Sequence, residues 1–200
     1  MEMIINFLSS FEQVLSSFFQ VVGPWSVLFS SLLLVCESIM PILPSSVFIA
    51  INFIYFGKLV GFVISWICAC LGCYISFSLC RSKIKGFLEK KILKEKGKKK
   101  MERLVNIIDN IDVSLLTLLI ACPFTPACII NILCGLSNMS KKKFMLSILI
   151  GKVFMVYFFG YVGTTLMDCI THPIYMVRVI ILLVAAFIIS KISLKITNIE

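Results

Sequence analysis

The feature that most constrains this chain is residues 59–80, LVGFVISWICACLGCYISFSLC, a run of 22 apolar and uncharged residues that proline does not interrupt. A helix of this length measures about 33 Å, enough to cross the roughly 30 Å hydrocarbon layer of a bilayer. The rest of the chain is also apolar: 60% of its 200 residues are hydrophobic, against about 45–50% in soluble domains. The sequence therefore predicts a single-domain, all-α integral membrane protein.

Positive charge is concentrated in residues 81–103, which hold eleven Lys and Arg against three Glu. A nucleic-acid-binding patch is one interpretation of such a cluster. In so apolar a chain, a cytoplasmic loop that follows the positive-inside rule explains the cluster better, and no nucleic-acid partner is expected. Gly97 argues against one continuous helix here, so a solvated loop is predicted.

Two other hydrophobic segments are each interrupted by a pair of prolines. The pairs are Pro41 with Pro44, and Pro123 with Pro126. The flanking halves have ten or twelve residues and cover 25–36, 45–56, 113–122 and 127–136. A twelve-residue helix measures about 18 Å, so none of these halves crosses a membrane alone. Each proline also removes a backbone donor and disfavours helix at the residue before it. Each segment is therefore predicted to be a re-entrant hairpin.

The predicted order of elements follows from these lengths. It comprises an N-terminal amphipathic or spanning helix at 1–24, hairpins at 25–57 and 104–137, spans at 59–80, 144–166 and 174–190, and a cytoplasmic tail at 191–200. The first residues, MEMIINFLSS, have neither the basic residue nor the cleavage site of a signal peptide, so residue 1 is expected to be retained. A multi-pass plasma-membrane protein is predicted.

Lysine placement predicts that the two hairpins are inverted. If the second hairpin enters and leaves by one face, then 81–103, Lys141–Lys143 and the C-terminal lysines all lie in the cytoplasm. The first hairpin then opens to the outside. Membrane lipids are the expected partners, and homo-oligomerisation is left open.

Broken segments in inverted halves are typical of transport sites near the bilayer midplane. Both segments have the order Pro-x-x-Pro, Asn, Gly. The candidate groove residues are Glu37, Pro41, Pro44, Ser45, Ser46, Asn52, Asp112, Pro123, Pro126, Asn131 and Lys152. The candidate helix-packing residues are Gly57, Gly61, Gly72, Gly135 and Gly151.

Three of these candidates have alternative interpretations. Glu37 either faces a polar cavity or ends a half-helix at the interface. Asp112 is equally consistent with the groove or with a simple interfacial position. Lys152 either belongs to the site or extends to the inner face by snorkelling.

The nine cysteines are interpreted as small apolar packing residues. Cys68, Cys70 and Cys73 do not all share one helix face, and His172 is the only histidine. Structural zinc requires four such ligands. No metal, disulfide or cofactor is therefore expected.

Several stretches resemble the DedA superfamily, also called VTT-domain or SNARE-associated Golgi proteins, and look closest to its Tvp38-like branch. They are ESIMPILPSS (37–46), FGKLVGFVISWICACLGCYISFSLCR (56–81), PFTPACIINILCGLSNMSKKKF (123–144) and the run from Gly151 to Gly163. The resemblance implies two opposed re-entrant hairpins among spanning helices. It also implies a link to moving phospholipids or polyprenyl-phosphate carriers across bilayers by flipping or scrambling. Glu37 falls on the family's membrane acidic position.

Two positions depart from the family pattern. Ser45 and Ser46 stand where many members have an acidic residue, and Ile120 and Ala121 stand where many have an arginine. The resemblance therefore implies neither proton coupling nor phosphate binding by those groups in this chain.

The leading expectation is a lipid transporter, flippase- or scramblase-like, and not an enzyme. A proton- or ion-coupled small-solute transporter and a membrane scaffold for envelope homeostasis are the alternatives. The clustered aspartates of lipid phosphotransferases are absent. Gly135-Leu-Ser137 only partly matches an intramembrane protease, and His172 is predicted on the other face.

Overall fold

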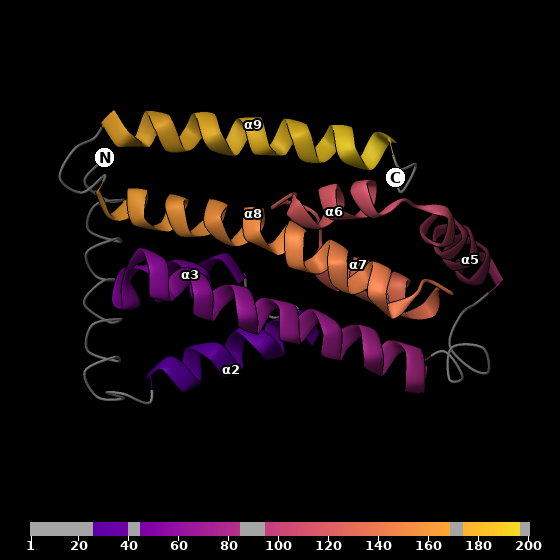
Figure 1. Ribbon diagram of the computed structural model, residues 1–200. Coiled ribbons are helices and arrows are strands. Elements are labelled where there is room, and N and C mark those ends of the chain that lie inside the picture. Colours follow the sequence, from indigo (N-terminus) through magenta and orange to yellow (C-terminus); the bar gives the residue numbers. More distant parts are fainter. Residues whose placement is uncertain (1–25, 40–44, 85–94, 169–173, 197–200) are drawn as a thin grey trace.

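The computed structural model describes residues 26–39, 45–84, 95–168 and 174–196. This part of the chain is helical and contains no strand. Its elements are α2 (Ser26–Ile39), α3 (Ser45–Leu79), η2 (Cys80–Ile84), α5 (Glu95–Asn110), α6 (Val113–Ala121), α7 (Ala127–Leu136), α8 (Lys141–Asp168) and α9 (Ile174–Ile196) (Figure 1). The predicted N-terminal helix at 1–24, and Pro41 with Pro44, lie outside the described residues.

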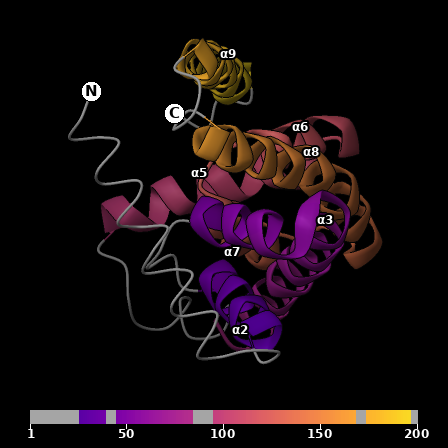
Figure 2. The ribbon, with the colours of Figure 1, turned by 90° about the vertical axis from the view of Figure 1, so that its left-hand side faces the viewer.

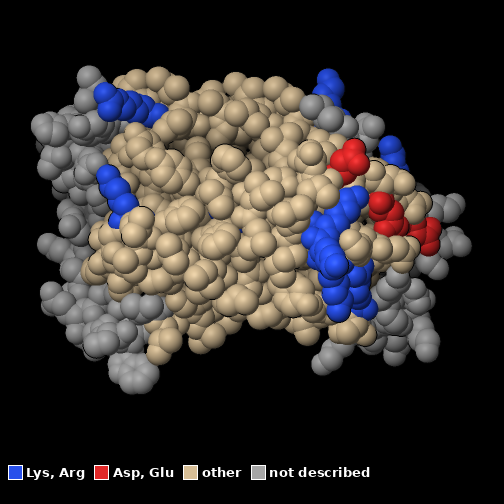
Figure 3. All heavy atoms as spheres, viewed as in Figure 1, with Lys and Arg blue, Asp and Glu red and all other residues tan. Residues whose placement is uncertain are grey.

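Three of the described helices are long and apolar enough to cross a membrane, which confirms the predicted class. They are Ser45–Ser82, Lys141–Thr165 and Val177–Lys195. On the face shown in Figure 3, a broad belt without Lys, Arg, Asp or Glu covers the middle of the molecule, with charged side chains at its two ends. Large aliphatic and aromatic residues are exposed on this belt, as expected for a lipid-facing surface.

α3 is two antiparallel helical parts joined at Gly57. Gly57 has φ 76° and ψ 169°, a backbone conformation open essentially only to glycine. After this turn the chain runs back along itself: Gly61 lies against the backbone carbonyl of Asn52 so closely that any side chain on Gly61 would collide with it. We call the two parts the arm (45–56) and the span (58–79). The turn coincides with the predicted end of the first hairpin.

The chain path has two opposed reversals (Figure 1). α2 runs from one end of the molecule to its middle, the arm returns to that end, and the span crosses to the other end. There α6 runs inward, α7 returns, and α8 and α9 each cross the molecule. We call α2 with the arm the first broken segment, and α6 with α7 the second; they open towards opposite ends.

We call the end that carries η2, α5 and Lys141–Lys143 the basic end, and the end that carries Gly57 the far end. Figure 2, viewed from the far end, shows α9 at one edge of the bundle next to α8, and α2 on the opposite side. The inner helices, α3 and α8, make the most extensive helix contact of the described structure.

The basic segment differs from its prediction. Residues 95–110 form one helix through Gly97, and its last part is bent by 119° from α6. The predicted loop at 81–103 is therefore wrong for residues 81–84, which belong to η2, and from residue 95 onward. The inward helix of the second segment begins at Val113 rather than at residue 104. Ile108 is buried in the core, with Leu104 and Val105 packed against that core. This packing outweighs the cost of about 1 kcal/mol for a helical glycine.

The last two helices are longer than predicted. α8 covers Lys141–Asp168, and α9 continues to Ile196 instead of ending at residue 190. Ser193 is buried while Lys191 and Lys195 are exposed, so the final turns of α9 still have a packed face.

Candidate functional site

The inner ends of the two broken segments meet inside the molecule. Cys128, in the first turn of α7, donates a hydrogen bond from Sγ to the backbone oxygen of Ile39, the last residue of α2, at 3.8 Å. The carboxylate of Glu37 is also close enough to act electrostatically on Cys128. The residues around both breaks therefore share one region in the interior of the bundle.

Glu37, near the end of α2, makes polar contacts with Ser45, on the other side of the first break. The backbone N–H and the hydroxyl group of Ser45 both donate hydrogen bonds to the Glu37 carboxylate. Ser45 is the first residue of α3, so the carboxylate sits where unsatisfied amides and the helix dipole favour a negative charge. Glu37 is half-buried at this position. Its carboxylate therefore lies between the end of α2 and the start of α3.

Lys152 brings a positive charge to the same region from α8. Its side chain is only 3% exposed, and Nζ donates to Sδ of Met155 at 3.2 Å. The ammonium group acts electrostatically on Glu37 and on Cys70 of the span. The side chain is buried near the middle of α8, so the snorkelling alternative is wrong. A charge here costs several kcal/mol unless a partner compensates it.

Asn52 and Asn131 are fully buried and keep spare hydrogen-bonding capacity. Nδ2 of Asn52 donates to Oγ of Ser65 across the Gly57 turn at 2.9 Å. Oδ1 of Asn52 and Nδ2 of Asn131 have no hydrogen-bond partner within the described structure. Buried amide atoms are rarely left unpaired, so these two are candidates to bind a polar ligand or water.

Four of the five predicted packing glycines lie at close helix contacts. A Cβ on Gly72 of the span would lie 2.7 Å from Cβ of Ser38 in α2, and one on Gly151 of α8 would lie 2.9 Å from Cβ of Ile120 in α6. A Cβ on Gly135 of α7 would meet Cys80, while Gly61 meets the arm. At Gly57 no atom lies within 4 Å of the added Cβ, so its role is the turn rather than packing.

The chain is similar to known proteins over most of the elements described above. The family model of the VTT domain matches residues 43–165, more than half of the chain. The chain belongs to the VTT-domain family. The match covers the arm, the span, the second broken segment and most of α8, while α2 with Glu37 lies just before it.

Two relatives of this VTT-domain protein come from Bacillus subtilis (strain 168). The uncharacterized membrane protein YhjE is 28% identical over 194 residues, which cover 94% of this chain and 90% of YhjE. The uncharacterized protein YqeD is 32% identical over 131 residues, which cover 66% of this chain and 62% of YqeD. No solved structure matches the chain.

The remaining predicted site residues of the VTT domain lie around the centre or away from it. Ser46 is half-buried in the first turn of α3, and Pro123 and Pro126 form the turn between α6 and α7. Asp112 is exposed at the N-cap of α6, at the basic end, so the structure does not bring it together with Glu37 and Lys152.

Sequence reasoning missed the contribution of three residues. Ser65 and Cys128 contact the broken segments but were indistinguishable from other small residues in apolar runs. Arg81, known only as the end of the span, donates hydrogen bonds from its guanidinium to the backbone oxygens of Ser137, at 2.8 Å, and Met139, at 2.6 Å. Its guanidinium also lies 4.6 Å from the ring centroid of Phe77. Arg81 thereby holds the segment after α7 against the span.

Proposed function

We propose that this VTT-domain protein moves lipids between the two leaflets of a bilayer. The observation that carries the proposal is the buried ammonium group of Lys152, which acts electrostatically on the half-buried carboxylate of Glu37 near the point where the broken segments meet. In this proposal the lipid headgroup passes through the polar centre while the acyl chains stay in the bilayer.

The helix lengths support re-entry of both broken segments. α2 has 14 residues, α6 has nine and α7 has ten. These helices measure about 21, 14 and 15 Å, well short of a 30 Å hydrocarbon layer. Their breaks would then lie at membrane depth, where irregular backbone is tolerated only against protein or a polar cavity. The basic end would face the cytoplasm of a plasma membrane.

The chemistry of the centre fits a charged headgroup. Lys152 offers an ammonium group to a phosphate, and Glu37 offers a carboxylate to a cationic or hydroxylated headgroup. The unpaired amide atoms of Asn52 and Asn131 add an acceptor and a donor on the flanking helices. Lys152 would thus provide the positive charge that many family members place before the second proline pair.

A lipid translocation assay in proteoliposomes tests this proposal. Vesicles contain a fluorescent phospholipid, and an impermeant reductant destroys only the outer-leaflet signal. We expect the wild type to expose inner-leaflet lipid within minutes, and Lys152→Met to slow this about tenfold or more, because a charged hydrogen bond to phosphate contributes about 1.5–3 kcal/mol. Lys142→Met, at an exposed lysine of the basic end, is the matched control. If the wild type matches empty vesicles at every pH and lipid composition tried, lipid movement is not its function.

The position of Glu37 also favours a second candidate, a proton- or ion-coupled transporter of small solutes. A half-buried carboxylate that faces an ammonium group could change its protonation as a solute passes. In that case Glu37→Gln should abolish a flux driven by a pH gradient while leaving lipid distribution unchanged. Loss of lipid movement without any gradient-driven flux would instead support lipid transport.

A further inference from the structure

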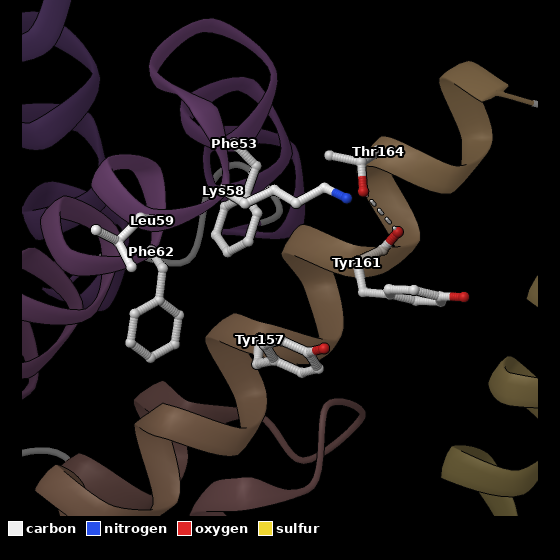
Figure 4. Close-up of a pocket in the computed structure, with 7 residues that line it drawn as sticks. All are labelled: Phe53, Lys58, Leu59, Phe62, Tyr157, Tyr161 and Thr164. Atoms are coloured by element: carbon white, nitrogen blue, oxygen red, sulfur yellow. Dashed lines mark hydrogen bonds between the residues drawn. The ribbon is translucent and has the colours of Figure 1, made fainter.

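A cavity of about 420 Å³ lies between α3 and α8, away from the central pair. Seven residues line it: Phe53, Lys58, Leu59, Phe62, Tyr157, Tyr161 and Thr164 (Figure 4). They come from the end of the arm, the start of the span and one face of α8. The cavity therefore adjoins the Gly57 turn at the far end of the molecule.

The walls of this cavity are aromatic and aliphatic, and its polar groups are few. Tyr157, Tyr161 and Thr164 follow one another along α8 over about 10 Å. The hydroxyl of Thr164 donates to the backbone oxygens of Gly160 and Tyr161, at 3.1 Å each, so its oxygen remains free to accept a hydrogen bond. A freely soluble anion would find little polar wall here, whereas an acyl chain would find apolar contact.

Lys58 is the one charged residue among those that line the cavity. It follows Gly57 directly, is exposed, and its side chain extends from α3 towards the α8 side of the cavity, where Thr164 and Tyr161 lie (Figure 4). Because no Asp or Glu is among the lining residues, the site has a net positive charge. Its charge is complementary to an anionic group.

Lys58 lies at the end of a membrane-spanning stretch, where lipid headgroups are expected. Lys58 directly follows Gly57 at the far end, and the exposed residues that come next along the span, Leu59, Val60 and Val63, are apolar. Lysine and tyrosine side chains are favoured at this boundary, where polar tips meet headgroups and ring faces meet acyl chains. Lys58 also lies opposite Lys141–Lys143, so the positive-inside rule does not account for it.

We propose that this cavity binds one anionic membrane lipid, with its phosphate on the Lys58 ammonium group and its upper acyl chain against Phe53, Phe62 and Tyr157. The cavity is then the docking site, in the leaflet at the far end, for lipid that enters or leaves the centre. This role rests on the proposed lipid transport. The Gly57 turn fixes the site, because it places Lys58 at the rim.

Photo-crosslinking of the full-length protein in nanodiscs tests the site. Two probes carry a diazirine on one acyl chain: a phosphatidylglycerol and a phosphatidylcholine. We expect the phosphatidylglycerol probe to label peptides that contain residues 53–62 or 157–164. Lys58→Gln should reduce that labelling about tenfold, while labelling by phosphatidylcholine stays the same. Lys58→Arg should retain the labelling, and Arg178→Gln, a basic residue on α9 that does not line the cavity, should leave it unchanged.

Three results would overturn the proposal. The first is equal labelling by both probes, and the second is labelling that Lys58→Gln leaves unchanged in a protein with wild-type thermal stability. The third is full displacement of the probe by inorganic phosphate, which would show a soluble-anion site. Failure of the proposed function is a separate result: normal labelling in a protein that moves no lipid supports the site and rejects transport.

Discussion

Few groups in the middle of the bundle compensate the positive charge of Lys152. Its hydrogen-bond acceptor is the thioether of Met155, a weak one, and Glu37 supplies the opposite charge. Both charges stand out in the sequence because they interrupt apolar runs, so both were predicted as site candidates. Their approach to each other could not be predicted, since it depends on how α2 and α8 pack. Ser65 and Cys128 could not be identified at all, because nothing separates them from other small residues of the spans.

A double-mutant cycle measures the coupling of this pair. Glu37→Gln and Lys152→Met should each lower the free energy of unfolding, because each leaves the other charge without compensation. The double variant should lose about 1–2 kcal/mol less than the sum of the single losses. Thermal unfolding in one detergent provides the measurement, with Glu37→Gln combined with Lys142→Met as the uncoupled control. Additive losses in the first pair would show that the two charges do not interact.

Arg81 offers a second prediction at the residue scale. Arg81→Lys keeps the charge but loses the planar guanidinium that contacts two carbonyl oxygens and the Phe77 ring. We expect a loss of about 1–3 kcal/mol in stability and faster hydrogen exchange at residues 137–140. Arg103→Lys, at an exposed arginine of α5, should change neither quantity. Unchanged exchange at 137–140 in Arg81→Lys would contradict the assigned role.

At the scale of elements, segment length and proline position carried most of the prediction. Short halves, paired prolines and the uncharged 22-residue run located α2, α6, α7 and the span closely, whereas α9 continues to Ile196, beyond its predicted end at residue 190. α5 was missed because Gly97 and the lysines were interpreted as a loop, although Met101, Leu104, Val105 and Ile108 follow helical spacing and pack at the core. The bend between α5 and α6 is set by that packing, and no residue pattern encodes it.

Glycine substitutions separate crowding from backbone strain. Gly72→Ala should destabilise the protein by about 1–3 kcal/mol, because the new methyl group would lie 2.7 Å from Cβ of Ser38. Gly57→Ala should cost a similar amount through its positive φ, with no collision. Ser38→Gly should restore part of the loss in Gly72→Ala and none in Gly57→Ala. Melting temperatures of the four variants provide the measurement, and equal restoration in both would reject the distinction.

At the scale of the whole molecule, the two halves interlock in the same way. Each inward helix packs on the span of its own half: α2 on Gly72 and α6 on Gly151. Each returning helix packs on the span of the other half: α7 places Gly135 against Phe77 and Cys80, and the arm lies against Gly160 and Gly163 of α8. Each half therefore packs its returning helix on the other half. Neither broken segment is fully packed without the other half, which gives a physical reason for the inverted arrangement of the two segments.

The inverted arrangement predicts that Gly57 and the segment after α7 face opposite sides of the membrane. We therefore expect Lys58→Cys to react with an impermeant maleimide only from outside intact cells, and Asn138→Cys only after the membrane is opened. Lys58 and Asn138 are both exposed, so the new thiols should be accessible once the reagent reaches their side. The unsubstituted protein gives the background from its own cysteines, of which Cys36 is exposed. Cysteines at positions 46 and 125, near the two breaks, test re-entry. Ser46→Cys should react only from the side on which Lys58→Cys reacts, and Thr125→Cys only from the side on which Asn138→Cys reacts. Reaction of the Lys58 and Asn138 variants from one common side would reject the inverted topology, and with it a headgroup path that connects the two leaflets.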